Sequence, residues 1–135
     1  PDLENTLVNG KNAYEEINDH EWVETEFLPK IQQRGAEIIK ARGASSASSA
    51  ARAACDTVKA VEHPTRSGDV FNAAVMSDGA YGMPEGIFSG FPLISNGDGS
   101  VEIVRDYNLS PFAKAGLEKT ANELLEEKDL VKDLI

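Results

Sequence analysis

The sequence predicts an α+β fold in which long helices pack on an antiparallel sheet. Apolar residues recur with helical spacing up to residue 62, short strand-like runs follow between residues 70 and 104, and a helical pattern returns after Ser110. The links between the strand-like runs are too short for crossover helices, so the strands are expected to pair antiparallel. A chain of 135 residues fits one domain.

The first predicted element is a small hairpin around Asn9-Gly10. This dipeptide lies between two short extended runs, Thr6–Val8 and Lys11–Ala13. Asn-Gly is the preferred two-residue hairpin loop, because both central residues must adopt positive φ. We expect this hairpin to be structural.

A long helix is predicted from Asp19 to Arg42. Asp19 is a suitable N-cap, and Gly43 can end the helix. Pro29 lies inside the pattern and predicts a kink near Phe27. The apolar face is formed by Trp22, Phe27, Ile31, Ile38 and Ile39.

A second helix is predicted from its N-cap Ser45 to about Glu62, where Pro64 enforces the end. The segment is rich in alanine, the best helix former, and its small side chains suit close packing. Cys55 lies within this helix and is interpreted as a small core residue, because free cysteines are often buried.

Three strands and a third helix complete the predicted fold. The strands are Val70–Met76, Gly86–Ile94 and Val101–Val104. Ser110 followed by Pro111 is the N-cap and first residue of the third helix. Its apolar face is formed by Phe112, Leu117, Ala121, Leu124 and Leu125, and is expected to continue towards Leu130.

Charge and composition exclude several classes of function. The net charge of −10 argues against nonspecific nucleic-acid binding. Apolar runs stay well below the roughly 18 residues of a membrane span, so no membrane partner is expected. The single cysteine, Cys55, excludes a disulfide within the chain and fits a reducing compartment.

Few residues are candidates for chemistry. Phosphate-binding glycine motifs are absent from the sequence, and one cysteine with two distant histidines excludes a Cys/His zinc site. His20 and His63 are interpreted as surface or capping residues. Ser45 and Ser49 are four residues apart, at the predicted N-terminal end of the second helix, where backbone N–H groups suit an anionic or amide-bearing ligand. The alternative is that Ser45 only caps the helix.

Several dispersed segments together resemble a known family. They are residues 31–47 (IQQRGAEIIKARGASSA), 49–53 (SAARA), 77–86 (SDGAYGMPEG), 91–92 (FP), 120–124 (TANEL) and 126–128 (EEK). In order and spacing they are similar to the C-terminal half of cytosolic-type malate dehydrogenases, in the lactate/malate dehydrogenase family. The resemblance covers essentially the whole chain.

The resemblance implies a two-domain, cytoplasmic enzyme of the tricarboxylic acid cycle. Residues 1–135 would be the C-terminal substrate-binding and dimerisation domain, and an N-terminal Rossmann domain absent from this chain would bind NAD. The reaction implied is reversible hydride transfer between malate or oxaloacetate and NAD(H), in a homodimer. The catalytic His–Asp pair and the substrate arginines would precede Pro1. This chain alone would then hold no catalytic residue and no metal, and would be inactive.

The family's pocket positions map onto four residues of this sequence. Ser45 and Ser49 match positions that face the substrate and the nicotinamide, and Gly43 and Ala50 match neighbouring positions more weakly. Two alternatives remain open: a lactate or other 2-hydroxy acid dehydrogenase of the same family, or a non-catalytic interaction domain with this fold.

Overall fold

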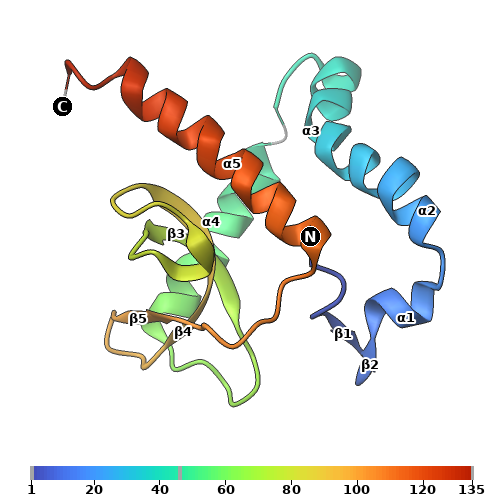
Figure 1. Cartoon of the computed structure of the whole chain (residues 1–135), viewed down its shortest axis with the longest axis horizontal. Coiled ribbons are helices and arrows are strands. Elements are labelled where there is room, and N and C mark those ends of the chain that lie inside the picture. The colour runs from blue at the N-terminus through green and yellow to red at the C-terminus, as the bar shows by residue number, and fades with distance from the viewer. Residues whose placement is uncertain (1, 46, 135) are drawn as a thin grey trace. The chain divides into compact units, whose positions relative to one another are not determined.

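The computed structural model describes residues 2–45 and 47–134 (Figure 1). Contacts divide the chain into two compact units, Pro1–Ala53 and Ala54–Ile135. The first unit contains the hairpin and the long helix, and the second contains the sheet and the C-terminal helix. Among the described helices, none has the length and hydropathy needed to span a membrane.

The predicted hairpin is confirmed. Strands β1 (Leu7–Val8) and β2 (Lys11–Asn12) pair antiparallel. Asn9 and Gly10 form the loop between them with φ values of 52° and 79°. Both residues therefore have the positive φ that this loop type requires.

A short helix, α1 (Ala13–Ile17), follows the hairpin and was not expected from the sequence. The Asn12 side chain caps it by accepting hydrogen bonds from the N–H groups of Tyr14 and Glu15, at 3.0 and 3.1 Å. Asn18 ends it in the left-handed region, with φ of 47°. Two asparagines therefore define this helix, because their short amides satisfy backbone groups that a helix end leaves unpaired.

The long helix is confirmed, with an interruption where Pro29 predicts one. It comprises α2 (His20–Trp22), a π-helical segment (Val23–Phe27) and α3 (Leu28–Arg42). The Asp19 carboxylate accepts the Trp22 N–H at 2.9 Å, as expected of an N-cap. The kink expected near Phe27 takes the form of the π-helical turn, since a proline ring clashes with the carbonyl four residues earlier.

Helix α4 (Ala47–Glu62) ends where the sequence predicts, and His63 follows with its N–H bonded to the Lys59 carbonyl at 3.1 Å. The prediction that Ser45 is its N-cap depends on Ser46, which lies outside the described residues. The prediction that Cys55 is a core residue is wrong, because Cys55 is exposed. Side chains from Ala47 to Lys59 are all exposed, so small size alone does not bury a residue in this stretch.

The three strands form one antiparallel sheet in the order β3-β4-β5, as predicted. They span Phe71–Met76 (β3), Phe88–Ser95 (β4) and Val101–Ile103 (β5). Strand β4 begins two residues later than expected. Gly86 lies in the preceding turn with φ of 73°, and its N–H bonds the Ser77 carbonyl at 3.1 Å.

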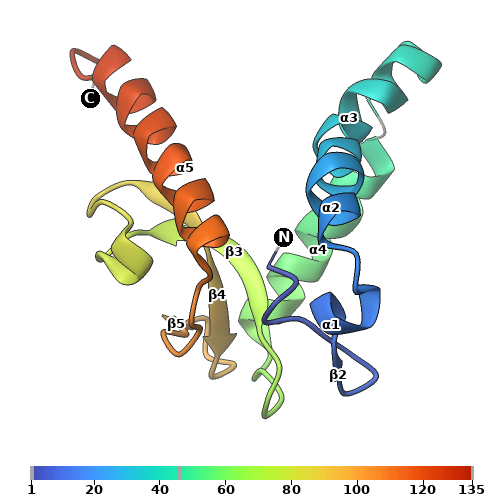
Figure 2. The same ribbon diagram turned by 45° about the vertical axis from the view of Figure 1, so that its right-hand side comes forward.

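Helix α5 (Pro111–Leu130) packs on this sheet (Figure 2). Ser110 Oγ accepts the Ala113 N–H at 3.2 Å, which confirms the predicted N-cap. Ala121 joins the core formed with Phe91 and Leu93, which are 2% and 1% exposed. Partly buried apolar residues around this core include Leu117 and Leu124 of α5.

The predicted apolar face of α5 is only partly used within this chain. Phe112, Leu125 and Leu130 are exposed, so the prediction is wrong for these three residues. Phe112 lies in the first turn of α5, and Leu125 and Leu130 lie in its last two turns. Both ends of α5 therefore leave apolar side chains exposed.

Truncation of Leu93 tests the core. We expect Leu93→Ala to lower the free energy of unfolding by about 3 kcal/mol, because it leaves a cavity among well-packed side chains. The matched control, Leu130→Ala, removes the same atoms from a side chain that is 83% exposed. It should change the free energy of unfolding by less than about 0.5 kcal/mol. Urea denaturation of both variants measures the difference, and equal losses would contradict this assignment of the core.

Candidate functional site

The four residues singled out by the sequence lie in one short stretch of the Pro1–Ala53 unit. Gly43 ends α3, Ser45 lies in the connection that follows, and Ser49 and Ala50 belong to the first turns of α4. All four are exposed. The structure therefore brings them together along the backbone and leaves their side chains accessible.

The local backbone explains the glycine at the end of α3. Gly43 has φ of 71°, and its N–H bonds the Ile39 carbonyl at 2.8 Å. A Cβ added at Gly43 would meet no atom within 4 Å, so the glycine is required by its conformation and not by crowding. The early turns of α4 offer backbone N–H groups, and serine hydroxyls can donate beside them.

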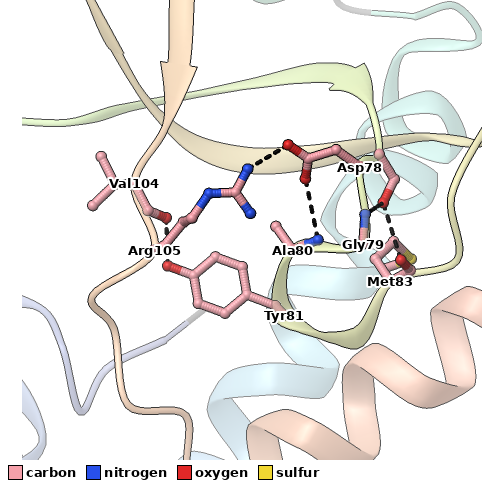
Figure 3. A network of polar contacts seen from close by, with 8 residues as sticks. Asp78, Gly79, Ala80, Tyr81, Met83, Val104 and Arg105 are labelled. Carbon is pink, nitrogen blue, oxygen red and sulfur yellow. Dashed lines mark hydrogen bonds and ion pairs between the residues drawn. The ribbon is translucent and has the colours of Figure 1, made fainter.

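A second polar cluster lies in the Ala54–Ile135 unit and was missed by the sequence analysis (Figure 3). Arg105 forms an ion pair with Asp78, and the other oxygen of that carboxylate accepts the Ala80 N–H at 3.2 Å. Nearby, the Tyr81 hydroxyl donates to the Val104 carbonyl at 2.5 Å. These contacts join the turn after β3 to the segment after β5.

The turn after β3 is further fixed by a buried serine. Ser77 is 4% exposed; its hydroxyl donates to the Met83 carbonyl at 3.0 Å and accepts the Gly79 N–H at 3.2 Å. Tyr81 adopts φ of 55°, which is uncommon for a bulky residue. The hydrogen bond from the Tyr81 hydroxyl to Val104 and the two hydrogen bonds of the Ser77 hydroxyl hold this turn in an otherwise unfavourable conformation.

The ionisation of this cluster suits a structural role. The hydrogen bond from Arg105 holds the pKa of the Asp78 carboxyl below its ordinary 3.8. Burial raises the pKa of the Tyr81 phenol above its ordinary 10. Near pH 7 the carboxyl therefore stays charged and the phenol stays protonated, so neither is tuned for proton transfer.

The remaining candidate residues stand apart from both clusters. His20 and His63 are exposed, which confirms them as surface residues, and the His20 ring stacks on Tyr14 with centroids 4.1 Å apart. Within residues 2–45 and 47–134, no three side chains of His, Cys, Asp or Glu gather as they would around a metal ion.

Comparison with known proteins defines the class of this chain. Residues 1–135 match the family described as lactate/malate dehydrogenase, alpha/beta C-terminal domain. The chain therefore belongs to this family, and its helices packed on an antiparallel sheet are the family's fold. Both the resemblance and the fold class predicted from the sequence are confirmed.

Individual relatives give a finer comparison. A malate dehydrogenase from Magnetococcus marinus is 48% identical over 135 residues, which cover 100% of this chain and 41% of that protein. The crystal structure of malate dehydrogenase from Naegleria fowleri matches with a TM-score of 0.89 and 37% identity, covering 100% of this chain and 41% of that one. This chain thus spans about two-fifths of the length of both relatives.

A lactate dehydrogenase also shares the fold. The structure of the Trichomonas vaginalis enzyme in complex with NADH and oxamate matches with a TM-score of 0.86 and 27% identity, covering 98% of this chain and 41% of that one. The fold is therefore common to relatives named for either substrate, and fold alone does not distinguish the two.

The Asp78–Arg105 pair predicts a pH-dependent stability. Because folding lowers the pKa of Asp78 below 3.8, its contribution is fully present above that value and is lost as pH falls through the lowered pKa. We expect Asp78→Asn to lower the thermal midpoint at neutral pH, with the deficit shrinking below about pH 4. Thermal unfolding followed by circular dichroism between about pH 7 and pH 3 measures this.

The control for this series is Asp69→Asn, which removes the same charge from an exposed turn residue. This variant should leave the pH dependence of the thermal midpoint close to that of the unmodified chain. A deficit for Asp78→Asn that stayed constant across the whole pH range would contradict a role for the ionised carboxylate.

Proposed function

We propose that this chain is the substrate-binding part of an NAD-dependent malate dehydrogenase, which transfers hydride reversibly from malate to NAD and so forms oxaloacetate and NADH. The observation that carries the proposal is the 48% identity to the Magnetococcus marinus malate dehydrogenase over the full 135 residues. The Naegleria fowleri malate dehydrogenase, at 37% identity over the whole chain, supports the same assignment.

In this proposal the chain is one of two domains. Residues 1–135 form the C-terminal substrate-binding and dimerisation domain, and an N-terminal Rossmann domain of the same protein binds NAD and supplies the His–Asp pair and the substrate arginines. The 41% coverage of the relatives supports a longer protein.

Ser45 and Ser49 are the residues of this chain proposed to contact the ligands. Their hydroxyls would donate hydrogen bonds to a substrate carboxylate oxygen or to the nicotinamide carboxamide, and Gly43 and Ala50 would leave room beside them. NAD, when bound, supplies the acceptor or donor of the hydride. The fit rests on exposed hydroxyls and small side chains around the early turns of α4.

Lactate is the alternative substrate. The match to a lactate dehydrogenase at a TM-score of 0.86 favours it as the second candidate. Malate carries two carboxylates and lactate one, so discrimination requires a cation facing the second carboxylate. That cation is proposed to lie in the N-terminal domain, which makes substrate preference a property of the longer protein.

A homodimer in the cytoplasm completes the proposal. Trp22, Ile31 and Ile39 of the α2–α3 helix are 42%, 51% and 51% exposed, and the rings of Trp22 and Phe27 lie 5.3 Å apart. An exposed apolar helical face of this kind supports burial against a second copy. The single exposed Cys55 is compatible with a reducing compartment.

Substrate preference tests the activity. The full-length protein that carries this chain should oxidise NADH with oxaloacetate at a kcat/KM at least about a hundredfold above that with pyruvate, because only oxaloacetate has the second carboxylate. Spectrophotometric NADH oxidation measures both rates, and sedimentation of the same sample checks the dimer. A preference for pyruvate would establish the lactate alternative, and inactivity with both would favour an interaction domain.

Replacement of Ser45 tests the site. We expect Ser45→Val in the full-length protein to lower kcat/KM for oxaloacetate about tenfold, because a hydrogen bond to a charged group is lost. The control, Ser67→Val, changes an exposed serine in the turn after α4 and should leave the kinetics unchanged. Unchanged kinetics for Ser45→Val, with an unchanged melting temperature, would remove Ser45 from the site.

A further inference from the structure

We propose that Lys40 and Arg42 steer the dianionic substrate towards the stretch that carries Ser45 and Ser49. This inference rests on the proposed function and extends it to two residues that contact no reacting atom. They would act on substrate capture through their charge, and not on the hydride transfer itself.

The sign of the charge reverses along the chain near the candidate site. The whole sequence carries a net charge of −10. Residues 2–29 contain eight acidic side chains and one basic one, whereas residues 30–52 contain one acidic side chain and five basic ones. The candidate site therefore lies in a locally positive segment of a strongly negative chain.

The two cations lie next to the candidate site in the sequence. Lys40 and Arg42 lie in the last turn of α3, and Gly43 ends that helix immediately afterwards. Ser45 is three positions after Arg42, so their Cα atoms lie at most about 11 Å apart. That limit is close to the Debye length of about 8 Å at physiological ionic strength, and the long arginine side chain can bring its charge closer still.

The charges of Lys40 and Arg42 are accessible to an approaching anion. Both side chains are exposed. Among residues 2–45 and 47–134, neither Lys40 nor Arg42 has a carboxylate partner, whereas Arg34 of the same helix pairs with Glu37 at 3.3 Å. The two positive charges are therefore not neutralised within the described chain.

Steering of the substrate and stabilisation of the helix dipole predict different effects. Cations at a helix C-terminus also stabilise the helix dipole, and that effect would alter stability without altering substrate capture. An anion approaching the negatively charged surface of this chain is repelled on average, and a positive segment beside the site raises the local concentration of the anion. Steering therefore predicts a change in KM that depends on salt.

The experiment uses the full-length protein and the double variant Lys40→Gln/Arg42→Gln. At an ionic strength of about 0.02 M and saturating NADH, we expect kcat/KM for oxaloacetate to fall about threefold to tenfold through KM, with kcat unchanged. The difference from the unmodified protein should vanish near about 0.5 M salt, where the charges are screened. Melting temperatures of both proteins, measured at each salt concentration, monitor the dipole effect.

The matched control is Lys30→Gln/Arg34→Gln. It removes the same two residue types, and the same net charge, from the N-terminal half of α3. At a rise of 1.5 Å per residue these positions lie about 12 to 15 Å further from the site, so any effect should be smaller.

The outcomes separate the inference from the function on which it rests. Equal effects of the two double variants, or a loss of kcat/KM that salt does not diminish, would overturn steering while leaving the dehydrogenase activity in place. An unmodified protein that does not reduce oxaloacetate would overturn both proposals.

Discussion

Burial of the central strand β4 is the constraint on which the Ala54–Ile135 unit depends. Strand β4 pairs with both other strands, and its buried residues Phe91 and Leu93 meet Ala121 of α5. The alternation along the strand places these side chains towards the helix. Loss of this contact would leave a narrow three-stranded sheet without a cover for its apolar face.

The conformation of the turn after β3 also depends on this sheet. It leaves β3 and returns to β4, and its conformation is fixed by the Ser77 hydroxyl and by the contacts of Asp78 and Tyr81 with the segment after β5. Sequence reasoning recognised a turn here but missed the pair of Asp78 with Arg105. The two residues are 27 positions apart and have no local signal in common.

Local chemistry explains which elements could be predicted. The Asn9-Gly10 loop and the caps Asp19 and Ser110 act within a few residues, so their geometry follows from the sequence. The exposure of Cys55 and of the apolar residues at the two ends of α5 depends on which other elements cover those surfaces, and composition does not record that. The candidate site was recognised by resemblance, because serines at a helix start are far more often caps than ligands.

The chain is proposed to work as part of a longer dehydrogenase. The exposed apolar residues of α5 and of the α2–α3 helix fit surfaces that such a protein would cover. The most direct measurement is purification of the native protein, followed by intact mass and NADH oxidation with oxaloacetate. We expect an active species of about 35 kDa that contains this sequence, since 14.5 kDa would be 41% of that mass. Recovery of only a 14.5 kDa species, without activity, would contradict it.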